Sequence, residues 1–317
     1  MVPLADPHRL TDLHRNWRPA PAVATIVIAA TSVGSAFASY FARRLTDGGI
    51  SPVAVAFFRF AIIAAVLTPL VAWDRPRRGA TTWGLASGAA MGLGWIAYVD
   101  AIDRGAVATA GVVYMTFPLF TLFAARLVFG IRPSPRSVGA AGLVIVAALV
   151  ALGAPGTGVP LTALVAPATF GFSIAVLTER LGVLDPFERL GAVALGAMVA
   201  LVPLVATMEP SEVVPLTLSG WTWLIGIGVG CALLPMLLYA AVAQRVGAAG
   251  AAMAGSAELP TVFAIGAVFF GEGISAGQLV AALTIGVAIA MTTVRRSGVG
   301  VQSVEMPPST GTTAPVV

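Results

Sequence analysis

Residues 247–271 read GAAGAAMAGSAELPTVFAIGAVFFG, and Glu258 is the one ionisable residue among them. A helix needs roughly 20 residues to cross a hydrocarbon core of about 30 Å, so this stretch is long enough to span a bilayer. It also lacks the charged face that a surface helix of a soluble protein carries. The stretch therefore predicts a membrane-spanning helix.

Nine further apolar stretches of similar length fill most of the remaining chain. Hydrophobic residues make up 58% of the sequence and charged residues 10%, against about 45–50% and about 25% in soluble domains. We therefore predict an all-α membrane protein with ten transmembrane helices. The ten stretches are 21–42, 52–73, 82–102, 106–129, 137–153, 159–177, 186–206, 218–243, 247–271 and 276–294.

The composition excludes several function classes. The chain contains no lysine, which argues against a phosphate-binding P-loop and against a Schiff-base cofactor. Both histidines, His8 and His14, precede the first stretch, and Cys231 is the one cysteine, so we expect no metal site, no cofactor and no intrachain disulfide. The arginines are scattered through loops, which favours lipid headgroups over nucleic acid as their partners.

The distribution of arginine predicts an orientation. If every stretch crosses once, thirteen arginines share a side with both chain ends and three lie on the other side. An excess of arginine marks the cytoplasmic side, so both termini should be cytoplasmic in a bacterial inner (plasma) membrane. The thirteen are Arg9, Arg15, Arg18, Arg75, Arg77, Arg78, Arg132, Arg136, Arg180, Arg189, Arg245, Arg295 and Arg296, and the three are Arg43, Arg44 and Arg104.

The two halves of the chain resemble each other. Pro52 and Pro69 frame the second stretch as Pro186 and Pro203 frame the seventh, at a spacing of 134 residues. Other matches at similar spacings are Trp83 with Trp223, Gly105 with Gly247, Pro118 with Pro260 and Gly130 with Gly271. We expect a cytoplasmic tail at 1–20, five-helix repeats at 21–153 and 154–294, and a disordered cytoplasmic tail at 295–317.

A repeat of five helices has a topological consequence. Because five is odd, the second half must cross the membrane in the opposite direction to the first. Inverted repeats are typical of secondary transporters, in which two similar halves rock about a site near the membrane midplane. A duplication that built a stable bundle without transport is the alternative explanation.

Motifs in both halves carry a family resemblance. The second half contains Gly247-Ala248-Ala249, then Glu258-Leu259-Pro260, then Phe270-Gly271-Glu272 and a last helix rich in Ala and Gly. The first half has Arg59-Phe60, Pro118 and Gly130 in the corresponding order. This pattern resembles the EamA family of the drug/metabolite transporter superfamily over roughly residues 20–294. The resemblance implies a ten-helix inverted-repeat carrier that moves small organic molecules, often outward.

The sequence departs from the family pattern at two places. Gly130 is followed by Ile131 where the family has a Gly-Glu pair, so the acid is present only in the second half, as Glu272. Leu259 separates Glu258 from Pro260, whereas in many relatives the acid directly precedes the proline. One extra residue rotates Glu258 by about 100° around the helix, so its orientation does not follow from the relatives.

Two ionisable residues lie deep within the predicted spans. Glu258 is near mid-membrane beside Pro260, whose missing amide frees a backbone carbonyl. It is a candidate for proton coupling or for binding a substrate cation, and a structural hydrogen bond is the alternative. Arg59 lies about 12 Å into the second helix. It is a candidate for binding an anionic substrate group, and an ion pair with Glu258 or Asp100 is the alternative.

Softer patterns supply the remaining candidates. Trp95, Tyr98 and Tyr114 are candidate aromatic walls for an organic substrate, although aromatic residues at such spacings also serve packing. Further candidates are the hydroxyl residues Thr31 and Ser35, which with Ser39 share one face of the first helix, and the helix-breaking residues Pro118 and Pro260.

Taken together, these features predict a secondary active transporter that exports small metabolites or drug-like molecules, coupled to protons or another ion, and not an enzyme. Its expected partners are a small-molecule substrate, the lipid bilayer and a second copy of the chain in a homodimer. Two alternatives stay open at this point. A membrane enzyme acting on lipids would need a cluster of acids, histidines or a nucleophile near one interface, and a passive channel or scaffold would ignore an imposed pH gradient.

Overall fold

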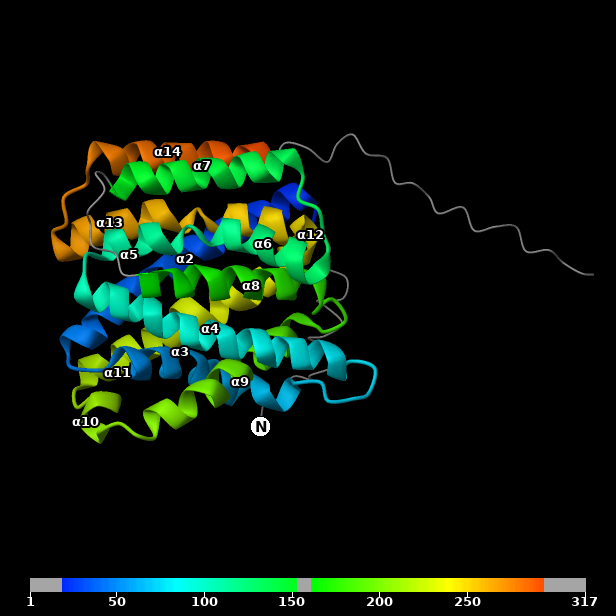
Figure 1. Cartoon of the computed structure of the whole chain (residues 1–317). Coiled ribbons are helices and arrows are strands. Elements are labelled where there is room, and N and C mark those ends of the chain that lie inside the picture. The colour runs from blue at the N-terminus through cyan, green and yellow to red at the C-terminus, as the bar shows by residue number, and fades with distance from the viewer. Residues whose placement is uncertain (1–18, 153–160, 294–317) are drawn as a thin grey trace, which may run out of the picture.

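The computed structural model describes residues 19–152 and 161–293, and all regular elements in these two ranges are helical (Figure 1). Seven helices in these ranges are long and apolar enough to cross a membrane, and two shorter apolar helices cover Pro135–Val150 and Ala276–Met291. One of the seven, Leu218–Phe270, has 53 residues, more than twice the length that one crossing needs. The all-helical class is therefore confirmed, and the predicted tails lie almost wholly outside the described residues.

The elements follow one another in two similar series. The first series is α2 (Pro21–Asp47), α3 (Pro52–Leu67), the 3₁₀ turn η1 (Thr68–Leu70), α4 (Arg78–Arg104), α5 (Val107–Tyr114), α6 (Phe117–Phe129) and α7 (Pro135–Leu152). The second series is η2 (Leu161–Leu164), α8 (Val165–Glu179), α9 (Pro186–Val205), α10 (Pro210–Val213), α11 (Leu218–Ile225), the π-helical η3 (Gly226–Leu233), α12 (Leu234–Gly255), α13 (Glu258–Phe270) and α14 (Ala276–Thr293).

Helix starts are set by local chemistry. The Ser51 hydroxyl accepts a hydrogen bond from the Ala54 amide at 3.1 Å, and Pro52 occupies the first helical position of α3. Its counterpart α9 starts in the same way, with Asp185 as the capping residue and Pro186 after it. A side-chain cap satisfies one of the free amides of the first turn, and proline there loses no hydrogen bond. The prolines at a spacing of 134 residues therefore mark two equivalent helix starts.

The helix contacts stay the same when each helix is replaced by its counterpart in the other half. Helix α4 packs against α8, and the equivalent exchange pairs α12 with α2. Likewise α6 packs against α8 as α13 packs against α2, while α3 packs against α9 and α7 against α14. Each contact thus has its counterpart under the exchange, so the internal repeat in the sequence is also a repeat in three dimensions.

The repeat is inverted. In Figure 1 the loops after α2 and α4, the segment around α10 and the α13–α14 loop lie at the left-hand end of the bundle. The loops before α4, before α7 and before α9 lie at the right-hand end. Helix α4 therefore starts at the right and its counterpart α11 at the left, so equivalent helices run in opposite directions.

Two equivalent segments are broken in the middle. Helix α5 ends at Tyr114 and α6 begins at Phe117, while α12 ends at Gly255 and α13 begins at Glu258. Both segments then end at a glycine with positive φ, Gly130 at 71° and Gly271 at 66°, a conformation that other residues rarely adopt. The Leu218–Phe270 region also turns at Gly247, where φ is 70° and ψ is 176°.

Two glycines allow α4 and α9 to approach closely. A Cβ atom at Gly88 would collide with the backbone of Val193, and a Cβ atom at Gly196 would collide with the backbone of Leu85. The two contacts are reciprocal, one glycine from each helix. Such small-residue contacts let helices associate in lipid through van der Waals packing, where the hydrophobic effect gives no drive.

We expect Gly88→Ala to lower the thermal denaturation midpoint by a few degrees, because overpacking of this kind typically costs about 1–3 kcal/mol. The measurement is the loss of monodisperse detergent-solubilised protein on heating, followed by size-exclusion chromatography. The matched control is Gly142→Ala in α7, where a Cβ atom would meet nothing within 4 Å. That variant should be unchanged or slightly stabilised, and equal losses in both variants would contradict the packing argument.

Candidate functional site

A cavity lies between the two halves of the bundle. Its walls come from α2, α3, α4 and α5 in the first half, and from α8, α9, α12 and α13 in the second half. Its volume is about 80 Å³, which is room for a few water molecules. Most of its lining is apolar, and the charged side chains that reach it are Arg59, Arg189 and Glu258.

Arg59 projects from α3 into this cavity without an anionic partner. Its side chain is buried, and its guanidinium carbon lies 3.8 Å from the centre of the Trp95 ring. The Nε and Nη1 atoms have no hydrogen-bond partner, and Nη2 is 4.0 Å from the sulfur of Met236. The cation is thus stabilised by an aromatic face while two of its donor atoms remain free. The alternative role for Arg59, an ion pair with Glu258 or Asp100, is not formed among the described residues, and Asp100 instead binds Arg104 at 2.7 Å.

Glu258 faces the same cavity from the opposite half. It is the first residue of α13, directly after the break that follows Gly255. Within the described residues its carboxylate makes no hydrogen bond or ion pair, although it lies close enough to Arg59 for an electrostatic interaction. The orientation that the sequence left open is thereby known: Glu258 lines the cavity.

The predicted aromatic residues form one continuous group. Trp95 and Tyr98 have ring centres 5.1 Å apart, and Tyr98 and Tyr114 are 4.7 Å apart. Trp95 and Tyr114 line the cavity, whereas Tyr98 is packed behind them. Trp95 Nε1 and the hydroxyl of Tyr239, a cavity residue that the sequence did not single out, lack hydrogen-bond partners. These two groups are therefore free to form hydrogen bonds with a molecule in the cavity.

The hydroxyl face of α2 contributes only in part. Ser35 lines the cavity together with Ser32, which the sequence analysis did not select. Thr31 and Ser39 instead donate to carbonyls of their own helix, at Ile28 and Ala36, and neither lines the cavity. The cavity meets α2 along the edge that Ser32 and Ser35 share, so Thr31 lies outside its lining.

Pro118 and Pro260 lie just after the two helix breaks. The Leu119 amide bonds the Thr116 carbonyl, and the Leu259 amide bonds the Ser256 carbonyl, both in tight turns at the junction. Pro118 is the second residue of α6 and Pro260 is the third residue of α13. Both lie in the first turn of the new helix, where a missing amide costs little. The break at Ser256 and Ala257 delivers Glu258 to the cavity.

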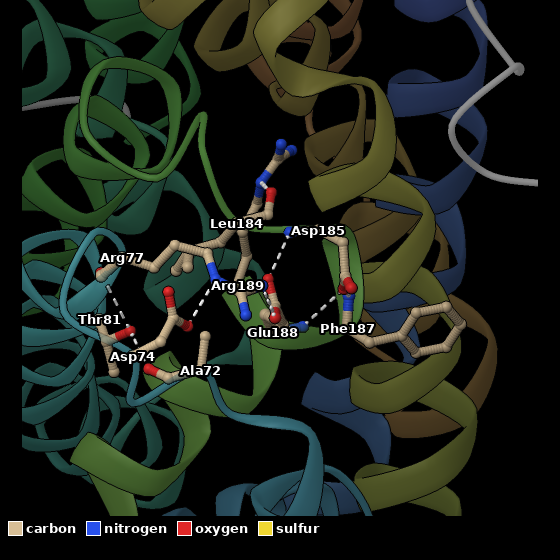
Figure 2. Close-up of polar contacts among 9 residues, drawn as sticks. All are labelled: Ala72, Asp74, Arg77, Thr81, Leu184, Asp185, Phe187, Glu188 and Arg189. Carbon is tan, nitrogen blue, oxygen red and sulfur yellow. Dashed lines mark hydrogen bonds and ion pairs between the residues drawn. The ribbon is translucent and has the colours of Figure 1, made fainter. Parts of the chain in front are cut away.

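Besides Arg59 and Glu258 in the cavity, a cluster of charged side chains lies where α9 starts (Figure 2). Arg77 binds Asp74 at 2.7 Å and also pairs with the buried Glu188. Glu188 accepts from the Asp185 amide at 2.9 Å, and the Asp185 side chain accepts from the amides of Phe187 and Glu188. Partial desolvation disfavours the charge on Arg77, but Asp74 and Glu188 outweigh it, so the pKa of Arg77 is raised.

Arg189, near the start of α9, lines the cavity. Its guanidinium donates to the carbonyls of Leu181 and Leu184 at 2.9 and 2.7 Å, and to that of Ala240 at 2.8 Å. These bonds join the α8–α9 loop to α12. From the sequence, Arg189 was expected only as one of the arginines on the cytoplasmic side, so this role was not predicted. The available signal was Asp185 with Glu188 three residues later, a capping box that starts α9 one turn before Arg189.

Glu272, the acid that the first half lacks, connects the halves at the other end of the bundle. Its carboxylate accepts hydrogen bonds from the amides of Val107 and Ala108 at 2.8 and 3.0 Å. These are the first amides of α5, so Glu272 caps that helix from the α13–α14 loop. It is a structural residue outside the cavity.

The family model described as "EamA-like transporter family" matches residues 22–153 and 158–294. The chain belongs to this family. The two matches correspond to the two structural repeats, and they confirm the resemblance that the sequence motifs indicated. The EamA domain identifies a membrane transporter of the drug/metabolite transporter superfamily.

Solved structures support the fold. One crystal structure of a protein that is 18% identical superimposes on this EamA chain with a TM-score of 0.65, covering 86% of this chain and 98% of the other. At that identity the likeness shows the fold alone. No curated protein sequence matches the chain. The cavity chemistry of this EamA protein must therefore be argued from its own residues.

The two buried arginines should respond oppositely to the same substitution. We expect Arg59→Met to leave the thermal midpoint unchanged or raised, because it removes a buried cation with free donors. Arg189→Met should lower it by several degrees, because the carbonyls of Leu181, Leu184 and Ala240 lose their donor. Thermal denaturation in detergent measures both midpoints, and equal losses in the two variants would contradict the view that Arg59 is unsatisfied.

Proposed function

We propose that this EamA protein is a secondary active transporter that exports a small organic molecule in exchange for protons, with Glu258 as the coupling residue. The observation that carries the proposal is the unpaired Glu258 carboxylate at a helix break, facing a cavity between two inverted halves. Discontinuous helices that meet at the interface of inverted repeats are typical of substrate and ion sites in secondary transporters. We take the central cavity as the substrate site.

Ten crossings fit the element lengths. The Leu218–Phe270 region turns at Gly247, so we divide it into two crossings. The shorter apolar helices α7 and α14 pack against each other and supply two more. With the remaining six spans this gives five crossings per repeat, the odd number that an inverted repeat requires.

The arginine distribution supports a cytoplasmic location for one end of the bundle. The loops that carry Arg75, Arg77, Arg132 and Arg180 gather at the right-hand end in Figure 1. We propose that this end is cytoplasmic, that both termini lie there, and that the membrane is the bacterial plasma membrane. Glu258 would then exchange its proton from within the membrane during the transport cycle.

Exchange of substrate for protons follows if the Glu258 carboxylate binds either a proton or the substrate, but not both at once. A proton entering from outside neutralises Glu258, and a substrate entering from the cytoplasm needs the charged carboxylate. The titratable groups that interact electrostatically with Glu258 are Arg59, Tyr98, Tyr114, Tyr239 and Cys231. None of these residues has a carboxyl group, so Glu258 is the one carboxylate that can carry the proton in the described part of the cavity.

The function is tested by the export of metabolites from cells that overproduce the protein. We expect one compound class to accumulate outside these cells, with a rate that saturates and rises when the outside is made more acidic. In Glu258→Gln the dependence on the pH gradient should disappear, because glutamine cannot exchange a proton. Accumulation is measured by mass spectrometry of the medium at several imposed pH gradients.

The matched control is Glu179→Gln, since Glu179 lies exposed at the end of α8, away from the cavity. It should keep both export and its dependence on pH. Gradient dependence that survives in Glu258→Gln would remove Glu258 from coupling. Flux that neither saturates nor responds to the gradient in the wild type would indicate a passive channel, and altered membrane lipids without export would indicate an enzyme acting on lipids.

A further inference from the structure

We propose that the cavity binds a small zwitterion with an apolar body, whose anionic group lies on Arg59 and whose ammonium group lies on Glu258. The proposal rests on the proposed transport function and specifies its substrate class. The substrate would then join the two halves, since Arg59 belongs to the first repeat and Glu258 to the second.

The charges of the cavity call for a ligand that carries both signs. Arg59 has two buried donor atoms without partners, and the Glu258 carboxylate has no hydrogen bond or ion pair within the described residues. The two face one cavity but do not bind each other. Arg59 is buried and Glu258 is partly buried. A charge removed from water is costly unless it is paired, so each of these groups is a site for an opposite charge.

Trp95 holds the guanidinium in a fixed place. The Arg59 guanidinium lies over the Trp95 ring at 3.8 Å, which stabilises the cation without using any of its N–H groups. Nε and Nη1 therefore remain available for a carboxylate. Charge-assisted hydrogen bonds of this kind are about twice as strong as neutral ones, so the anionic group of the substrate has a prepared site.

The other charged group of the cavity is already satisfied. Arg189 donates to the carbonyls of Leu181, Leu184 and Ala240. The cavity thus offers one free cation and one free anion among its described residues. A substrate with several negative charges would leave charge unpaired, and a simple cation would lie beside Arg59.

The rest of the lining specifies an apolar body. Phe170, Ile174 and Leu177 come from α8, Val193 comes from α9 and Met236 comes from α12. Ser173, the polar residue of α8 in this wall, already donates to the Ser87 carbonyl at 3.0 Å. Other uncharged polar groups of the lining, among them Ser32, Ser35, Trp95 Nε1 and the Tyr239 hydroxyl, belong to other helices. The face that α8 presents is therefore apolar, and an aliphatic or aromatic substituent fits it best.

The test uses matched trios of compounds that share one apolar body. Each trio contains the amino acid, the acid without its amino group and the amine without its carboxyl group. Built on alanine, leucine and phenylalanine, the trios are alanine, propanoate and ethylamine; leucine, 4-methylpentanoate and 3-methylbutylamine; and phenylalanine, 3-phenylpropanoate and phenethylamine. Binding to the purified wild-type protein is measured by isothermal titration calorimetry and by the thermal shift that each compound causes.

We expect the amino acid of at least one trio to bind about 10- to 100-fold more tightly than its acid and its amine, because each stripped compound loses one charged contact and leaves a buried charge unpaired. In Glu258→Gln the affinity for the amino acid should fall to that for the acid. In Arg59→Met it should fall to that for the amine. Glu179→Gln should bind like the wild type.

Glu258→Gln should still bind the acid, and Arg59→Met should still bind the amine. Because each variant keeps its affinity for one compound, a loss of binding to the amino acid can be distinguished from a loss of structure. Monodispersity of both variants on size-exclusion chromatography verifies their folding. The proposal is overturned if an acid or an amine binds the wild type as tightly as its amino acid in every trio, or if no trio contains a compound that binds. Export that depends on the pH gradient but carries a compound with a single charge would leave the proposed function intact and overturn the zwitterion. Binding of the zwitterion without flux that depends on the pH gradient would support the substrate class and overturn the proposed proton-coupled export.

Discussion

The hydrocarbon core of a bilayer offers no water to a free backbone N–H or C=O, and this constraint shapes the whole protein. Each unsatisfied group costs several kcal/mol, so the described spans are helical and their breaks are confined to the interior. The breaks between α5 and α6 and between α12 and α13 retain tight-turn hydrogen bonds. Both lie between neighbouring helices, where polar backbone is tolerated, and one of them delivers Glu258 to the cavity.

The two buried arginines show how the protein distributes stability and function. Arg189 is bound by carbonyls of the α8–α9 loop and α12, so its burial contributes to the structure. Arg59 is equally buried but has only the Trp95 ring and a distant sulfur beside it. A group left unsatisfied in a buried position lowers stability, and under the proposed function a substrate would complete the contacts of Arg59. The free carboxylate of Glu258 in the same cavity has the same explanation.

The inverted repeat explains why these unpaired charges occur once. Arg59 on α3 has an apolar counterpart near Val193 on α9, and Glu258 corresponds in the repeat to Thr116. The duplication therefore supplied two equivalent scaffolds, and the charged chemistry was placed on different helices of each. Glu272 follows the same rule, since it caps α5 from the second half and the first half has Ile131 at its position. The two repeats have the same backbone arrangement, but Arg59 and Glu258 each occur in only one of them, so the cavity between the halves holds one of each.

The sequence by itself determined the membrane-spanning class, the helix starts at Pro52 and Pro186, the repeat and the two deep charges, because length, apolar composition, capping and proline all act locally along the chain. Only the tertiary structure decided that Arg59 stacks on Trp95 and leaves Glu258 free, that Ser32 and not Thr31 reaches the cavity, and that Arg189 is bound by carbonyls of two segments. These outcomes depend on how each helix is rotated about its axis and which neighbour it faces. In a chain whose helices are apolar on all sides, periodicity does not specify that rotation, and packing between helices distant in sequence does.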